Sequence, residues 1–357
     1  MERSPQKILF FSRGKGRGHA VPDAAIAAEL LALYPNVDIT FVSYSLGGAT
    51  LRQLGWRVVD LALPEDNPVW ETVSRIIPVV QAHNPRLVIS HEEFVAVPIS
   101  KGCGVPVVFM TDWFMREDYL YMQCLKDSNE ILFLEEPGYY DEPSYLKGRI
   151  HYTGFVFRDL GTGTRSNVEA KALLGLPQES TVVLVAPGGA SIHTEDRAPL
   201  FDLLLEAFRS LNAVEKHLIW VVDGPDRETL AKKAETLDCV SIIAPHQDFT
   251  ATMVASDLVI TKGNRTPLLE CEALGIPSIS VSFGHDPIDD FRVGRISMNT
   301  ALRAQGISSL LLRDHMVRAL GRKGAFVART TGEISEGRKA AARRLRDHLE
   351  AAIASAA

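Results

Sequence analysis

Short apolar runs without polar alternation recur along the 357-residue chain, and segments with helical spacing of apolar residues separate them. Such runs are typical of strands buried on both faces, and their alternation with helices predicts doubly wound parallel sheets. The predicted strands are Lys7 to Phe11, Ile39 to Ser43, Arg57 to Ala62, Leu87 to Ser90, Val107 to Met110, Ile131 to Leu134, Thr181 to Ala186, Leu218 to Val222, Val240 to Ala244, Leu258 to Thr261 and Ser278 to Val281.

The pattern is interrupted once, near Gly154, and it starts again at Thr181. Between them, Arg158 to Asn167 is rich in Gly, Thr and Arg, as linkers often are. A domain usually holds about 100–200 residues, so the length also favours two domains. We expect an α/β protein with two Rossmann-like domains facing a cleft, at residues 1–157 and 158–332, followed by a C-terminal helix at residues 333–357.

Composition excludes several classes of protein. The net charge of −6 argues against a strongly basic nucleic-acid binder, so no nucleic-acid partner is expected. No apolar run approaches the roughly 18 residues of a membrane span, and the first residues do not resemble a signal peptide. The four cysteines form no C-x-x-C pair, which is typical of reduced thiols. We expect a cytoplasmic protein, with the inner membrane face as an alternative location.

The loop after the first predicted strand contains three alternating glycines followed by a histidine. Gly16 and Gly18 can let backbone amides approach a ligand, or they can simply form a tight turn. The spacing is not the G-x-G-x-x-G of dinucleotide binding, and no acidic residue ends the second strand, which disfavours a dehydrogenase. His19 begins the next helix, where either a catalytic or a structural role is possible.

Two loops of the second half also follow predicted strands. The amides around Gly188, Gly189 and Ser191 can cradle a diphosphate or form a turn. Downstream, Thr266 is a good N-cap, and the helix N-terminus that it would begin attracts anions beside Arg265. Glu270, expected in the first turn of that helix, can accept hydrogen bonds from two ribose hydroxyls or can merely complement the helix dipole.

The last of these segments, from Asp257 to Pro277, resembles a motif of the GT-B glycosyltransferases that use nucleotide-diphosphate sugars. The closest likenesses are to the bacterial lipid-intermediate N-acetylglucosaminyltransferase of peptidoglycan synthesis and to the diacylglycerol galactosyltransferases. The shared features are a strand-end Asp, a small glycine turn, a helix bearing Glu and a Gly-x-Pro, which match Asp257, Gly263, Glu270, Gly275 and Pro277.

The resemblance implies a role for further residues. In the second domain, Glu270 would bind the ribose, His246 and Phe249 the base, and Asp289 and Asp290 the donor sugar. In the first domain, which would bind the acceptor, His19 ends the glycine loop, and the strand-end loops of Glu92 and Asp112 would approach the acceptor. Two departures from the family pattern matter. Gly263-Asn264-Arg265 stands where the family has a small pair after the strand, and Asp stands where the family has the Gln that holds hydroxyls of the donor sugar.

These features predict inverting transfer of a sugar from a UDP or dTDP donor to a hydroxyl acceptor. The chain has no D-x-D triplet, so neither a metal nor a cofactor is expected. The helix N-terminus at Thr266, with Arg265 and the loop amides, would offset the charge of the leaving diphosphate. His19 would be the base, with Glu92 or Asp112 orienting it. A nucleotide-sugar hydrolase and a non-catalytic nucleotide-sugar-binding protein are the alternatives.

The last predicted helix carries a cluster of basic residues, namely Arg338, Lys339, Arg343, Arg344 and Arg346. A charge cluster on a helix is usually a solvated face, and contact with anionic lipid or an acidic acceptor is the alternative. The expected partners are therefore a nucleotide sugar and a small-molecule, natural-product or lipid acceptor, with weak peripheral membrane contact possible.

Overall fold

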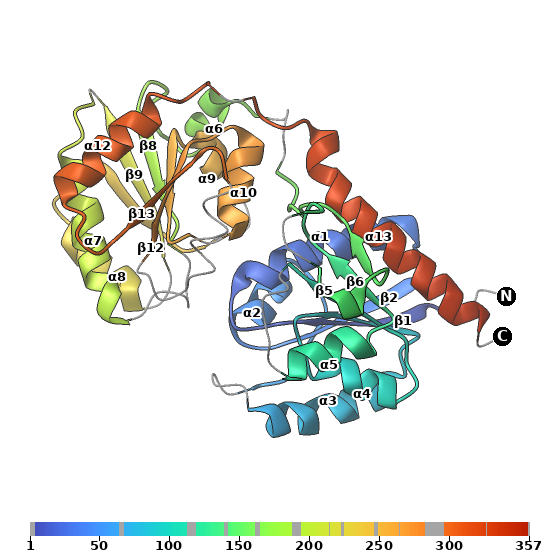
Figure 1. Cartoon of the computed structure of the whole chain (residues 1–357). Coiled ribbons are helices and arrows are strands. Elements are labelled where there is room, and N and C mark those ends of the chain that lie inside the picture. Colours follow the sequence, from blue (N-terminus) through green and yellow to red (C-terminus); the bar gives the residue numbers. More distant parts are fainter. Residues whose placement is uncertain are drawn as a thin grey trace. The chain divides into compact units, whose positions relative to one another are not determined.

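The computed structural model describes residues 4–63, 68–112, 119–138, 142–160, 165–187, 194–213, 215–222, 225–245, 249–263, 265–282, 296–325 and 327–355. The chain forms two compact units (Figure 1). Unit 1 comprises Met1–Asp159 and Gly332–Ala357, and unit 2 comprises Leu160–Thr331.

Unit 1 is built on a parallel sheet in the order β3-β2-β1-β4-β5-β6-β7. The strands are β1 Gln6–Ser12, β2 Val37–Ser43, β3 Val58–Asp60, β4 Leu87–His91, β5 Val107–Thr111, β6 Glu130–Phe133 and β7 Ile150–Tyr152. The helices are α1 Arg17–Leu33, α2 Ser45–Gln53, α3 Val69–His83, α4 Ala96–Gly102, α5 Tyr119–Asp127 and α13 Thr331–Ala354.

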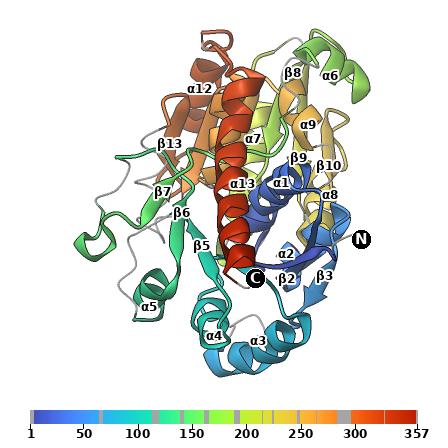
Figure 2. The ribbon, with the colours of Figure 1, turned by 90° about the vertical axis from the view of Figure 1, so that its right-hand side faces the viewer.

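The sequence of β1 explains why both faces of this sheet are covered. Ile8 and Phe10 point into one apolar cluster, and Leu9 and Phe11 into another, because successive side chains of a strand face opposite sides. The first cluster includes buried residues of α1 and α13, and these two helices lie side by side on the same face of the sheet (Figure 2). The second includes buried residues of α3, α4 and α5.

The C-terminal helix α13 packs within unit 1. A Cβ at Gly337 would lie 2.1 Å from the carbonyl oxygen of Phe155, so only glycine permits this approach. Arg344 and His348 both bind the carboxylate of Glu130 at the start of β6, at 2.6 and 2.8 Å. Four basic residues of the predicted cluster form ion pairs within the chain, namely Arg338 with Glu29, Arg343 with Glu336, Arg344 with Glu130 and Arg346 with Asp347.

Unit 2 has a parallel sheet in the order β10-β9-β8-β11-β12-β13. The strands are β8 Thr181–Val185, β9 Lys216–Val221, β10 Val240–Ile243, β11 Leu258–Thr261, β12 Ser278–Ser282 and β13 Asn299–Arg303. The helices are α6 Asn167–Leu173, α7 Thr194–Arg209, α8 Pro225–Ala234, α9 Phe249–Ala255, α10 Arg265–Leu274 and α12 Ser309–Leu320. Apolar clusters again line both faces.

The predicted fold class is confirmed, because every predicted strand overlaps an observed one. Two strands, β7 and β13, were not predicted, since their residues are only partly buried and carry a weak apolar signal. The helix boundary near residue 266 was also predicted wrongly. Helix α10 already begins at Arg265, so Thr266 lies inside it and Glu270 lies in its second turn.

Candidate active site

The carboxyl ends of β1 and β4 are adjacent in unit 1, since Ser12 pairs with His91. The loops that follow the two strands therefore lie together. The glycine loop after β1 packs tightly at Gly14, where a Cβ would lie 2.2 Å from the carbonyl oxygen of Tyr44. Added Cβ atoms at Gly16 and Gly18 would meet nothing within 4 Å, so the start of α1 has open space around it.

His19 and Glu92 meet at this end of the sheet. Nε2 of His19 lies 3.3 Å from Oε2 of Glu92, and the side chains are 27% and 8% exposed. Glu92 also accepts a hydrogen bond from the Thr111 hydroxyl at 2.9 Å and lies 3.6 Å from the Arg13 guanidinium. The arrangement is a reachable imidazole supported by a shielded carboxylate, and such an arrangement can serve general-base catalysis.

Glu92 adopts a left-handed backbone conformation, with φ of +53°. This conformation is strained for a residue with a side chain, and such strain is concentrated at functional sites. Burial favours the neutral carboxyl, but the hydrogen bond with His19 and the charges of His19, His91 and Arg13 outweigh it. The pKa of Glu92 is therefore lowered, and Glu92 stays ionised at neutral pH.

Two further side chains of this site had no predicted role. Asp23 is fully buried on α1, and its Oδ1 lies 2.6 Å from Nδ1 of His91. His91 is the last residue of β4, and its ring packs edge-to-face on that of His19 at 4.5 Å between centroids. Asp23 follows His19 by four residues, a helical spacing that was the only sequence signal for their proximity.

Asp112, the other residue predicted to orient His19, follows β5 and is partly buried. Its charge acts on His91, whose pKa it helps to raise. The imidazole of His19 is hydrogen-bonded to Glu92.

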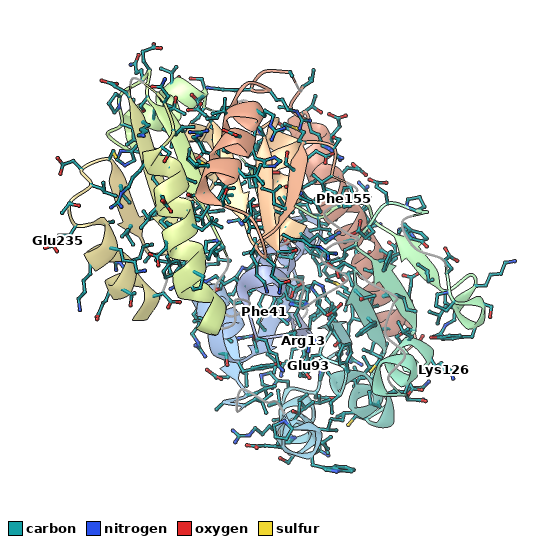
Figure 3. The ribbon with its side chains drawn as sticks, turned by 60° about the vertical axis from the view of Figure 1, so that its left-hand side comes forward. Arg13, Phe41, Glu93, Lys126, Phe155 and Glu235 are labelled. Carbon is teal, nitrogen blue, oxygen red and sulfur yellow. The ribbon has the colours of Figure 1, made fainter. Side chains whose placement is uncertain are left out.

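Glu93 is a second buried carboxyl group beside Glu92 and is only 4% exposed. It lies near Arg13 (Figure 3) and is hydrogen-bonded to Tyr44. Burial raises the pKa of Glu93 to about 7, against the opposing effects of Arg13, Tyr44 and Lys15. Two neighbouring carboxyl groups thus have pKa values shifted in opposite directions, a feature that often accompanies acid–base chemistry.

Replacing Glu93 with Gln should change the pH dependence of stability. Between the ordinary pKa of 4.5 and the folded value of about 7, the folded state binds more protons than the unfolded state. Stability contributed by this group is therefore lost as pH rises through that window. The free energy of unfolding of Glu93→Gln, relative to that of the wild type, should rise by up to about 3 kcal/mol between pH 5 and pH 8, as measured by urea denaturation. The exposed control Glu336→Gln should show no such gain, and an equal effect of Glu93→Gln at both pH values would contradict the assignment.

In unit 2, the turn after β11 requires glycine. Gly263 has φ of +107°, and its amide donates to the Thr261 hydroxyl at 2.9 Å. Arg265, Thr266 and Glu270 follow on α10, where the Glu270 residue has no exposed surface. Phe249 begins α9 and packs into the apolar cluster on one face of the sheet. The other predicted donor-site residues, Gly188, Gly189, Ser191, His246, Asn264, Asp289 and Asp290, lie outside the described residues.

Asp257, the strand-end Asp of the motif, lies at the opposite end of β11 from the Gly263 turn. Its carboxylate accepts from the backbone amide of Val182 at 2.7 Å and from the buried Lys171 ammonium at 3.1 Å. Lys323 binds the other carboxylate oxygen. Asp257 therefore links α6, β8 and the turn that follows α12, and this part of the motif is structural.

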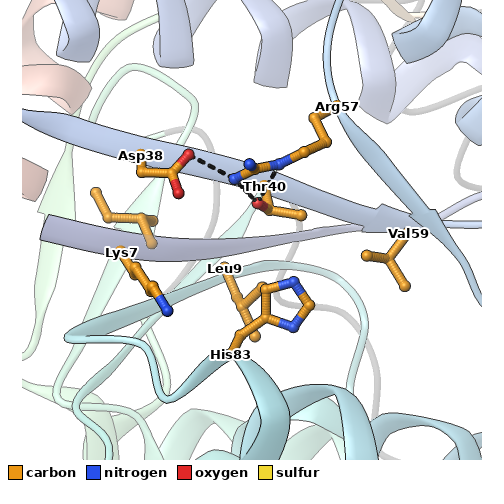
Figure 4. Close-up of a pocket in the computed structure, with 8 residues that line it drawn as sticks. Lys7, Leu9, Asp38, Thr40, Arg57, Val59 and His83 are labelled. Atoms are coloured by element: carbon orange, nitrogen blue, oxygen red, sulfur yellow. Dashed lines mark hydrogen bonds and ion pairs between the residues drawn. The ribbon is translucent and has the colours of Figure 1, made fainter. Parts of the chain in front are cut away.

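A cavity of about 220 Å³ lies near the amino ends of β1 and β2 (Figure 4). Arg57 reaches across its rim to Asp38 at 2.5 Å, and His83 and Lys7 also line it. None of the predicted site residues lines this cavity, which is at the other end of the strands from His19. Among the described residues, no group of three or more His, Cys, Asp or Glu could hold a metal ion.

The chain is similar in sequence to curated glycosyltransferases. No family model matches the chain. Two curated relatives are UDP-N-acetylglucosamine–N-acetylmuramyl-(pentapeptide) pyrophosphoryl-undecaprenol N-acetylglucosamine transferases. The one from Exiguobacterium sp. is 22% identical over 304 residues, covering 77% of this chain and 79% of the relative. The one from Chlorobaculum tepidum is 21% identical over 318 residues, covering 83% and 84%.

Solved structures show the same fold. The glycosyltransferase of kitacinnamycin has a TM-score of 0.62 and 17% identity, covering 98% of both chains. MurG from Acinetobacter baumannii has a TM-score of 0.61 and 12% identity, covering 97% of this chain and 99% of the other. A UDP-GlcNAc 2-epimerase from Neisseria meningitidis, bound to UDP-GlcNAc, has a TM-score of 0.68 and 15% identity, with 96% and 99% covered.

The fold and these similarities define the chain as a two-unit α/β protein of the GT-B type. The predicted resemblance to nucleotide-sugar glycosyltransferases, and to the peptidoglycan N-acetylglucosaminyltransferases in particular, is confirmed. In the described parts of the chain, no helix is long and apolar enough to cross a membrane.

Proposed function

We propose that this protein is an inverting, metal-independent glycosyltransferase that moves a sugar from a nucleotide-diphosphate donor to a hydroxyl acceptor. The observation that carries the proposal is the partly exposed His19 hydrogen-bonded to the shielded carboxylate of Glu92. The glycosyltransferases among the relatives and the fold neighbours support the choice of reaction.

In the proposed reaction, Glu92 accepts a hydrogen bond from the Nε2–H of neutral His19, so that Nδ1 carries the free lone pair. Nδ1 takes the proton of the acceptor hydroxyl while its oxygen forms a bond to the anomeric carbon of the donor. The bond from that carbon to the diphosphate breaks, and its electron pair leaves with the nucleotide. The ionised Glu92 stabilises the imidazolium that forms.

Unit 2 would bind the donor. We assign the ribose to Glu270 and charge compensation of the diphosphate to Arg265, Thr266 and the amino end of α10, with UDP or dTDP as the nucleotide. Glu270 is completely buried here, so its contact with ribose requires the residues that cover it to move. His246, Phe249, the Gly188–Gly189 amides, Asp289 and Asp290 remain proposed donor contacts from the resemblance.

Donor binding can be tested by the thermal stability of the protein with UDP, dTDP, GDP and their sugars. A ligand that binds only the folded state raises its stability, by about 2.7 kcal/mol at a hundredfold excess over Kd. UDP or dTDP should raise Tm, and Glu270→Gln should lose most of that rise, measured against the Tm of the same variant without ligand. Glu272→Gln, on the same helix, should keep the rise. No rise with any nucleotide, or an equal rise in Glu270→Gln, would contradict the donor site.

The relatives act, by name, on a pyrophosphoryl-undecaprenol intermediate. We propose a lipid-linked or small-molecule acceptor for this chain, and a cytoplasmic location, at the inner membrane face if the acceptor is a lipid. A nucleotide-sugar hydrolase would use water as the acceptor, and a non-catalytic binding protein would release no nucleotide. Since several fold neighbours are UDP-N-acetylglucosamine 2-epimerases, epimerised donor is a further product to be looked for.

A further inference from the structure

A buried ionisable pair lies next to the partly exposed His19–Glu92 pair, and the proposed reaction does not use it. Asp23 and His91 are joined by a 2.6 Å contact, and their side chains are 0% and 4% exposed. The other carboxylate oxygen of Asp23 is buried and has no hydrogen-bond partner among the described residues. Apolar side chains of similar volume are often as stable as a buried ion pair. Stability alone therefore does not explain why Asp23 and His91 are present.

The geometry connects this pair to both members of the candidate catalytic pair. Asp23 and His19 lie one turn apart on the same face of α1. The ring of His91 contacts the ring of His19 edge-to-face, with an angle of 71° between the planes. His91 also directly precedes Glu92 in the chain, and Glu92 is the residue with the left-handed backbone.

We propose that Asp23 and His91 are positioning residues for the His19–Glu92 pair. Asp23 holds the ring of His91 through Nδ1, and His91 in turn supports the ring of His19 and places a positive charge beside Glu92. The inference rests on the proposed function, because it is the base of that reaction that the pair would position. It adds two residues to a mechanism for which His19 and Glu92 would otherwise suffice.

The charges around His91 are consistent with this role. Burial acts to lower the pKa of His91, but the charge and hydrogen bond of Asp23, with the charges of Glu92 and Asp112, raise it overall. The groups that face the site are Asp23 and His19 from α1, Arg13 after β1, Glu92 after β4 and Asp112 after β5. Negative and positive groups thus alternate from Asp23 through His91 and Glu92 to Arg13.

A histidine titration followed by NMR tests the charge state without any assay of activity. In 15N-histidine-labelled wild-type protein, His91 is identified by the signals missing in His91→Gln. It should stay protonated at a pH where His315, whose pKa is lowered by burial, has lost its proton. In Asp23→Asn, His91 should lose its proton at a lower pH than in the wild type. A neutral His91 in the wild type at pH 6 would overturn the proposal. The wild-type titration needs only His91→Gln, which identifies the signals of His91.

Turnover kinetics test the positioning role. Asp23→Asn should lower kcat about tenfold or more, leave KM for the donor unchanged and alter the pH profile, because a misplaced base loses rate and not donor affinity. The double variant Asp23→Asn/His91→Gln should lose no more than either single variant, since the two residues act as a unit. Asp38→Asn, a matched change at the other end of the sheet, should keep kcat. Unchanged kcat and pH profile in a folded Asp23→Asn would overturn the proposal. A wild type without transferase activity would instead contradict the proposed function, and the titration would still report on the pair.

Discussion

His19→Gln should lower turnover by about a hundredfold or more, with the protein still folded and still able to bind the donor. General-base catalysis contributes about 10²–10⁴ to rate, and glutamine cannot take up the acceptor proton. The imidazole is reachable, at 27% exposure, and lies at the open amino end of α1. The measurement is nucleotide released per enzyme per second in the presence of acceptor, with donor binding followed separately by calorimetry.

His83→Gln is the matched control, because His83 ends α3 at the opposite end of the strands, beside the cavity of Figure 4. It should keep near-normal turnover. Near-normal turnover of His19→Gln would remove His19 as the base. A loss of donor binding in His19→Gln equal to its loss of turnover would instead indicate a binding role for this residue.

Asp257→Asn should destabilise the protein by about 3–5 kcal/mol. Lys171 is 3% exposed, and its ammonium group is paired with the buried carboxylate of Asp257. Removing the negative charge leaves a buried cation without its counter-charge, and the energetic penalty falls on the folded state. The free energy of unfolding, obtained from denaturant titration at pH 7, is the quantity to compare.

The control is Asp202→Asn, which removes one partner of the exposed Lys233–Asp202 pair in the same unit. Exposed pairs contribute about 0–1 kcal/mol, so this variant should unfold almost as the wild type does. Adding Lys171→Met to Asp257→Asn should recover part of the loss, because the uncompensated cation is then gone. Equal, small effects of Asp202→Asn and Asp257→Asn would contradict the structural role of Asp257.

Much of the fold could be predicted from the sequence because its strands are buried on both faces. Lys7 to Phe11 has no polar alternation, and the structure shows why: Phe10 and Phe11 enter the cores on opposite faces of one sheet. Strand β13 escaped prediction because Asn299 to Arg303 is partly exposed at the sheet edge. Local apolar patterning identifies central strands well and edge strands poorly.

The candidate site was only partly predictable. The glycine loop and His19 are a local pattern after a strand, and Glu92 was one of two residues expected to orient His19. The Asp23–His91 pair joins residues 68 positions apart, and it forms because β1 and β4 are neighbours with Ser12 opposite His91. The role of Asp257 likewise depends on Lys171, 86 positions away. Contacts of this kind depend on the order of the strands in the sheet, and a local sequence motif does not reveal that order.

Product analysis tests the proposed reaction most directly. The wild-type protein is incubated with isotopically labelled UDP sugar, with and without a panel of lipid-linked and small hydroxyl acceptors, and the label is followed by mass spectrometry. Our account predicts label joined to an acceptor with inverted anomeric configuration, together with one released nucleotide per sugar transferred. Free labelled sugar, an epimerised donor or intact donor under every condition would contradict it.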